Sequence, residues 1–350
     1  MKQVKYKIIL LAGLLVAAGA QADDRVSVNG FGFQDYRQTN ANFSEGANQR
    51  GTWDNNFFAV VMSAKISSRD TAWAQLQANS TEPTRFTWMF LSHQFTDNVS
   101  VHVGRVKFPY GLYNEFIDNK WLQLSAVLPT AYSGAADMAY DAYTGAGIDW
   151  TAGSFFTQLY GGNIYVTDPA SDDHADRRLI GGRITWNAPY EGLRFMVSAN
   201  EAQIEFNVNA PTAPLTTLTQ LGREDRAMVS ADYVSDRLDI KGEYNYHKVP
   251  FLSTNPSLTP TTISNAWYVQ GGVKLGMWTP YVRYDNYHAD QQDKTDPSKY
   301  QKEWVFGVNY KINDNVNTRI EDHVIRGYAL AESGSSINWN LIAAEVNFLF

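Results

Sequence analysis

The chain has 350 residues, a formal net charge of −7 and no cysteine. A nucleic-acid-binding protein would carry a basic face, so the acidic balance argues against that class. The absence of cysteine excludes disulfides, thiolate metal sites and a cysteine nucleophile. After residue 22, no stretch is apolar and long enough for a membrane-spanning helix.

Residues 1–22 have the pattern of a secretory signal peptide. Three lysines open the segment, and an apolar run over 8–18 follows them. This run is too short to cross a bilayer as an anchor. Ala20 and Ala22 form an A-x-A cleavage motif, which predicts a mature chain that begins at Asp23. An uncleaved N-terminal anchor is the alternative.

The mature chain alternates between apolar and polar residues, most clearly in the hairpin over 225–247. Val229, Ala231 and Tyr233 share one phase, and the polar residues of the second half of the hairpin share the other. Successive side chains of a strand point to opposite faces, so each strand has one apolar and one polar face. The pattern gives sixteen predicted strands, in chain order 26–38, 57–66, 71–78, 86–95, 99–106, 142–151, 154–162, 178–186, 192–200, 225–234, 237–247, 263–275, 277–288, 301–312, 316–326 and 337–350.

The connections between these strands alternate between tight turns and long polar loops. This alternation is typical of an antiparallel up-and-down transmembrane β-barrel with a lipid-facing outside and a wet inside. We therefore predict an all-β fold, a single barrel domain of about sixteen strands over 23–350. A soluble two-sheet sandwich is the alternative, although 328 residues are many for one sandwich. The long loops are 39–56, 79–85, 107–141, 163–177, 201–224, 248–262, 289–300 and 327–336.

If the apolar faces meet lipid, their polar alternates line the lumen. Such a wall would hold water and set an electric field across the pore. The alternative is that many of these side chains form pairs that stabilise the barrel. The predicted basic lining consists of Arg183, Arg194, Arg226, Lys241, Arg283 and Arg319, and the acidic lining of Asp232, Asp239, Glu243, Asp285, Glu321 and Glu345.

The longest loop, 107–141, is the candidate for a constriction. Arg105 and Lys107 stand at its entrance, and a proline and a glycine then force the chain off its strand path. A loop turned inward here would hold Glu115, Asp118 or Asp137 opposite the wall arginines. The alternative is a loop that covers the barrel from outside or clasps a neighbouring molecule.

These features resemble the Gram-negative porin family, whose members are sixteen-stranded and usually trimeric channels. The resemblance rests on the signal peptide, the sixteen strands, the long loop after the fifth strand and a last strand that ends in Phe350. Residues 104–115, GRVKFPYGLYNE, also resemble a porin-like stretch at the start of such a loop. The acidic P-E-F-G-G loop tip of enterobacterial porins is absent, so constriction residues are not carried over from that pattern.

The resemblance implies a passive channel for ions and small hydrophilic solutes in the bacterial outer membrane, surrounded by lipid and assembled as a homotrimer. A substrate-selective channel for a sugar, a phosphate or a dicarboxylate is the first alternative. An adhesin with a plugged lumen and a barrel hydrolase are two others. The six histidines are scattered, and the sequence has no zinc motif, nucleophile elbow or phosphate loop. We therefore expect no enzyme activity, no cofactor and no metal.

Overall fold

The computed structural model describes residues 25–80, 82–133, 136, 138–139, 142–164, 174–206, 220–250, 261–289 and 295–350. The signal-peptide prediction for residues 1–22 lies outside the described residues.

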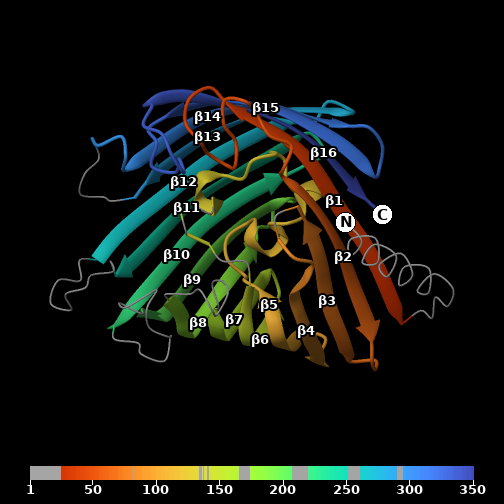
Figure 1. Cartoon of the computed structure of the whole chain (residues 1–350). Helices are drawn as coiled ribbons and strands as arrows, with labels where there is room; N and C mark the ends of the chain where they lie inside the picture. Colours follow the sequence, from red (N-terminus) through yellow and green to blue (C-terminus); the bar gives the residue numbers. More distant parts are fainter. Residues whose placement is uncertain are drawn as a thin grey trace, which may run out of the picture.

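The chain forms one closed antiparallel barrel in which neighbours in sequence pair and β1 pairs with β16 (Figure 1). The predicted fold class is therefore confirmed. The strands are β1 Val26–Thr39, β2 Asn56–Lys65, β3 Asp70–Asn79, β4 Arg85–Thr96, β5 Val99–Lys107, β6 Ala142–Ala152, β7 Phe155–Ile164, β8 His174–Asn187, β9 Leu193–Phe206, β10 Gln220–Val234, β11 Leu238–Pro250, β12 Thr261–Val273, β13 Trp278–His288, β14 Tyr300–Lys311, β15 Val316–Arg326 and β16 Asn338–Leu349.

The strands carry an apolar outer face and a polar inner face. In β15, Ile320 is 58% exposed on the outside, while Arg319 and Glu321 are almost completely buried on the inside. Alternate side chains of a strand face opposite sides, so the apolar half meets lipid and the polar half faces the lumen. No helix among the described residues is long and apolar enough to cross a membrane.

Several strands extend further than the sequence predicted, β8, β9 and β10 by the most residues. β8, β9 and β10 run several residues into the predicted loops 163–177 and 201–224. In this extension the outward face is charged: Arg223 on β10 pairs with Glu201 on β9 at 3.0 Å and with Asp225 at 2.6 Å. The outward residues cease to be apolar above the lipid belt, so a search for apolar alternation ends the strands too early.

The barrel closes where two glycines of β1 meet the aromatic end of β16. The register pairs Gly32 with Phe348, and the amide of Gly30 donates to the carbonyl of Phe350 at 2.9 Å. A Cβ atom at Gly30 would lie 2.0 Å from the Phe350 ring. The absence of side chains on these two glycines therefore lets both rings lie flat on the outside of β1.

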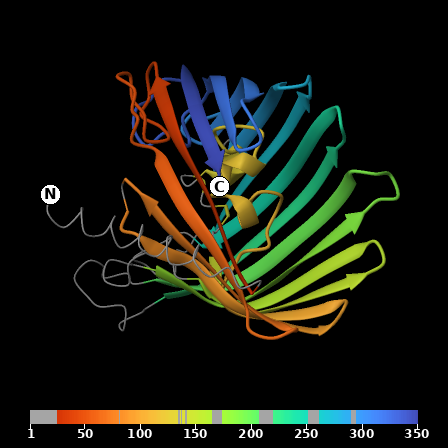
Figure 2. The ribbon, with the colours of Figure 1, turned by 90° about the vertical axis from the view of Figure 1, so that its right-hand side faces the viewer.

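The long segment after β5 runs inside the ring of strands, where Figures 1 and 2 show it as short yellow turns. It contains three single-turn 3₁₀ helices, η1 Asn114–Phe116, η2 Lys120–Leu122 and η3 Thr130–Tyr132. Leu124 packs against inner residues of β13 and β14, and Val127 packs against inner residues of β15 and β16. The apolar residues of this segment thus meet the inner wall of the barrel.

Candidate constriction site

Two wall arginines hold the carbonyl groups of the 107–141 loop. Arg319 on β15 pairs with Glu345 at 2.8 Å and donates to the carbonyls of Lys120 and Gln123 at 2.6 and 2.5 Å. Arg283 on β13 pairs with Asp285 at 2.6 Å. It also donates to the Ser125 hydroxyl and the Val127 carbonyl, both at 2.8 Å. Both arginines are fully buried, so they serve as hydrogen-bond donors to the loop backbone.

Wall carboxylates hold the amide groups of the same loop. Glu321 accepts from the backbone N–H groups of Ala126 and Val127 at 2.8 and 3.0 Å. Asp285 accepts from the N–H of Thr130 at 3.1 Å. Ala126 and Val127 lie between η2 and η3, and Thr130 begins η3, so none of these N–H groups has a helical partner. The buried carboxylates satisfy them with charge-assisted bonds.

Glu243 on β11 is the third acidic anchor. It accepts from the N–H of Leu112 at 2.7 Å and from the hydroxyls of Tyr132 and Tyr268 at 2.7 and 2.8 Å. The hydroxyl of Ser230 donates to it at 2.6 Å. Together, the arginines and carboxylates of β11–β16 fix the loop against one half of the inner wall.

The predicted loop acids do meet wall cations. Glu115 lies 2.5 Å from Arg183 on β8, whose guanidinium also donates to the Gly111 carbonyl at 3.2 Å. Asp118 accepts from Lys107 at 2.6 Å and from the inward-facing Gln75 of β3 at 3.0 Å. Asp137, the third predicted acid, lies outside the described residues.

Three other predicted lining cations pair with acids on their own or an adjacent strand. Arg194 binds Asp232 at 2.6 Å across β9 and β10. Arg226 pairs with Glu224, and Lys241 pairs with Asp239. These contacts fit the structural alternative, in which charge pairs stabilise the wall.

Arg105 is not brought to this cluster. Its ladder partners are Met89 and Thr144, both exposed on the outward face of the barrel. Its Nε donates to the carbonyl of Thr87 at 2.6 Å. Lys107 shares the alternation of Arg105, but it is the last residue of β5, and its long side chain reaches Asp118 in the loop. The sequence alone did not show that Lys107 faces the loop and Arg105 does not.

The loop is packed as well as hydrogen-bonded. Phe108, Tyr110 and Tyr113 have no exposed surface, and Tyr110 donates to Asn245 of β11 at 2.6 Å. Burial raises the pKa of Tyr110, Tyr113 and Tyr132, because the anionic form would be desolvated. These phenols therefore remain neutral at physiological pH.

Lys120 of η2 is buried as well. Desolvation lowers its pKa, while its Nζ donates to the Ala126 carbonyl at 2.7 Å. The same Nζ lies 5.7 Å from the centroid of the Phe33 ring on β1, within the range of a cation–π contact. Lys120 thus links the loop to the β1 side of the lumen.

Aromatic side chains on the opposite half of the wall were missed by the sequence reasoning. Phe31 and Phe33 of β1 stack on Phe57 of β2 with ring centroids 5.8 and 5.7 Å apart. Trp88 and Phe90 of β4 lie 5.8 Å apart. The sequence did contain a signal for the two β1 rings. Phe31 and Phe33 occupy the same alternate positions of the strand as Asp35 and Arg37, so they must face the same side as these charged residues.

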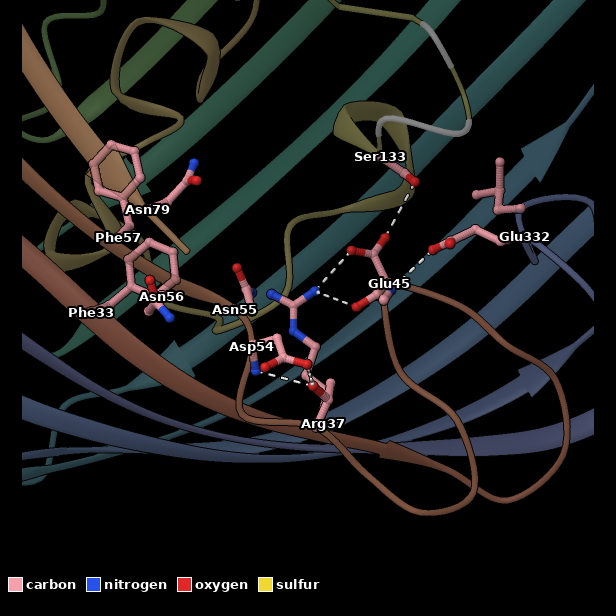
Figure 3. A pocket seen from close by; sticks show the side chains of 13 residues that line it. Phe33, Arg37, Glu45, Asp54, Asn55, Asn56, Phe57, Asn79, Ser133 and Glu332 are labelled. Carbon is pink, nitrogen blue, oxygen red and sulfur yellow. Dashed lines mark hydrogen bonds and ion pairs between the residues drawn. The ribbon is translucent and has the colours of Figure 1, made fainter. Parts of the chain in front are cut away.

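Two cavities lie along this aromatic half. The first has a volume of about 690 Å³, and Figure 3 shows Phe33 and Phe57 on one side of it and the Arg37–Glu45 pair on the other. The second has a volume of about 300 Å³ and lies along β4–β7, where His102 pairs with Asp149 at 2.8 Å. Among the described residues, no cluster of His, Asp and Glu could hold a metal ion. The geometry provides space for a solute and no arrangement for metal chemistry in the described part.

A closed barrel with an apolar outer belt, a charged interior and a loop fixed inside it defines the class of outer-membrane channels. A model of the Gram-negative porin family matches residues 9–321, so the chain belongs to that family, and its site is the bacterial outer membrane. The resemblance inferred from the sequence is thereby confirmed. No curated protein sequence matches the chain.

Solved structures share the fold at low sequence identity. OmpT of Vibrio cholerae, an outer-membrane protein, is 12% identical with a TM-score of 0.63, over 94% of this chain and 99% of that chain. The outer-membrane channel DcaP of Acinetobacter baumannii is 11% identical with a TM-score of 0.62, over 93% and 97%. OmpF of Salmonella typhi, solved in complex with daunomycin, is 12% identical with a TM-score of 0.61, over 93% and 97%. These similarities concern the fold.

Proposed function

We propose that the chain is a passive diffusion channel for ions and small hydrophilic solutes, with the 107–141 loop as its constriction. Solutes cross by partitioning and electrostatics, without covalent chemistry or a cofactor. The observation that carries this proposal is that the loop lies inside the lumen and leaves open space beside it. Its bonds to the wall are concentrated on β11–β15, through Glu243, Asp285, Arg319 and Glu321, with further contacts to β8 and β3, and the two cavities lie on the β1–β7 side.

The charges at the edge of the loop would set ion preference. Glu115 with Arg183 and Asp118 with Lys107 form two ion pairs where the loop meets β8, β5 and β3. The exposed parts of such pairs create a transverse field across a narrow water-filled passage. Because the pairs balance each other, we expect weak selectivity in the unmodified channel.

Single-channel recording tests this proposal. The purified barrel is added to a planar lipid bilayer, and the current is measured at symmetric salt and then under a salt gradient. We expect discrete current steps with a near-linear voltage dependence and a small reversal potential. A correctly folded barrel that inserts and gives no steps would contradict the channel proposal and favour a plugged adhesin.

Two further predictions of the sequence belong to the same proposal. We infer that the barrel assembles as a homotrimer, and that residues 1–22 are an export signal removed before Asp23. Electrophoresis without heating would show a trimer band that collapses to the monomer on boiling. Intact mass measurement of the protein from outer membranes would show a chain that starts at Asp23.

A further inference from the structure

The larger cavity combines stacked aromatic rings with planar polar groups. The rings of Phe33 and Phe57 are nearly parallel, with an interplanar angle of 7°, and they form one side of the space (Figure 3). The amides of Asn55, Asn56 and Asn79 line the same cavity. Its volume of about 690 Å³ lies within the usual range for small-molecule sites.

Phenylalanine rings that face a water-filled lumen are energetically unfavourable, so their presence indicates a function or mutual packing. A channel wall that serves ions alone is best lined by polar groups, because apolar surface in water is unfavourable. Here Phe31, Phe57 and Phe33 form a continuous stack along the inside of β1 and β2. The stack reduces its own exposure, yet Phe33 and Phe57 still border the cavity. They would present an apolar patch to any solute that occupies it.

The charges around the cavity are compensated or acidic. Arg37 pairs with Asp35 at 2.8 Å and with Glu45 at 2.9 Å. Glu332 accepts from the backbone N–H of Gly46 at 3.0 Å, and Asp54 from the Thr52 hydroxyl at 2.7 Å. Carboxylates outnumber the single arginine, so a phosphate or a dicarboxylate would meet net repulsion here.

We propose that this cavity binds uncharged saccharides on their way through the channel. A pyranose ring has an apolar C–H face that fits a flat aromatic ring, and a rim of hydroxyls that both donate and accept hydrogen bonds. The Phe33–Phe57 pair supplies the first surface, and the asparagine amides and paired carboxylates supply the second. The inference rests on the proposed channel function and names the class of solute that its lumen favours.

Sucrose is the probe, and its dose-dependent reduction of the single-channel current is the measurement. We expect a block that saturates, as binding requires, and no comparable block by gluconate or by a polyethylene glycol of similar mass. Glucosamine, which carries a protonated amine, tests whether charge dominates. Block by glucosamine without block by sucrose would overturn the proposal and assign the cavity to cations.

A matched pair of variants tests the aromatic surface. Phe57→Leu keeps an apolar side chain in the cavity but removes the ring, and we expect it to raise the half-blocking sucrose concentration about fivefold. Phe58→Leu makes the same change on the neighbouring residue, whose ring packs outside the lumen against Phe350 at 5.5 Å. It should leave the block unchanged. Equal block in both variants and the unmodified protein would contradict the proposal.

A second measurement separates failure of the site from failure of the channel. Saturation-transfer NMR on the detergent-solubilised barrel detects sucrose binding whether or not current flows. Transfer to the ring C–H protons, lost in Phe57→Leu and kept in Phe58→Leu, would support the site even if no conductance were found. A conducting channel with no sucrose block and no transfer would remove the inference and leave the channel proposal intact.

Discussion

The guanidinium of Arg183 on β8 lies 2.5 Å from the carboxylate of Glu115, the middle residue of η1 in the inward loop. The Arg183 side chain is almost completely buried, while that of Glu115 is 37% exposed. One partner is therefore fixed in the wall, and the other faces the open lumen. This asymmetry makes the pair a suitable point at which to change the charge of the passage without removing the wall.

Glu115→Gln should shift ion selectivity toward anions. The change removes the exposed negative charge and leaves Arg183 uncompensated. Two unit charges about 4 Å apart in water interact with an energy of about 1 kcal/mol. Loss of this attraction for a passing cation should raise the anion-to-cation permeability ratio by up to about fivefold. The reversal potential in a tenfold KCl gradient measures this, and the effect should shrink in concentrated salt. Glu191→Gln, in the exposed turn before β9, is the control and should change nothing.

Glu321→Gln should loosen the loop. Glu321 accepts two loop N–H groups, and the hydroxyl of Tyr281 donates to it at 2.5 Å. An amide can accept only through its oxygen, so its NH₂ group would face a donor, at a cost of about 1–3 kcal/mol. We expect frequent current fluctuations between two conductance levels. Asp314→Asn, in an exposed turn and paired with Lys311, should leave the recordings unchanged. Steady currents in Glu321→Gln would contradict the anchoring role.

Gly145→Ala should destabilise the barrel, whereas Gly271→Ala should be nearly neutral. A Cβ atom at Gly145 would lie 2.0 Å from the Gly161 carbonyl oxygen and 2.7 Å from the Cα atom of Gly162, both backbone atoms that cannot rotate away. At Gly271, no atom lies within 4 Å of the added carbon. Overpacking of this kind costs about 1–3 kcal/mol. Urea unfolding followed by tryptophan fluorescence measures the difference, and equal midpoints would contradict it.

The barrel was predictable from sequence because lipid imposes a strict alternation on every strand that crosses it. The rule failed in the parts of β9 and β10 that extend beyond the lipid belt, because outward residues there do not need to be apolar. Glu201 and Arg223 occupy outward positions in these parts. The rule also gave no indication of the inward rings of Phe31 and Phe33, because apolar side chains are expected on the lipid side of a barrel. The sequence of β1 showed that its residues alternate, but it did not show which of the two faces points into the lumen.

The constriction was predictable only in outline. Pro109 and the length of the segment indicated a loop leaving the wall, and its acids were expected opposite arginines. Which acid meets which cation depends on contacts between residues far apart in sequence, such as Ala126 with Glu321. This bond joins residues 195 positions apart in the chain, so no local pattern encodes it.

Arg105 and Lys107 were expected together at the loop entrance, but the structure places them in different surroundings. Arg105 donates to the Thr87 carbonyl beside outward-facing partners, whereas Lys107 pairs with Asp118 at the edge of the lumen. Lys107→Gln should leave Asp118 uncompensated and raise the cation-to-anion permeability ratio by up to about fivefold. Arg105→Gln should leave the ratio unchanged, although it removes the same charge two residues away. Reversal potentials of the two variants, measured side by side in a tenfold KCl gradient, decide the matter. A shift in Arg105→Gln equal to that in Lys107→Gln would place both cations on the pore and contradict the register of β5.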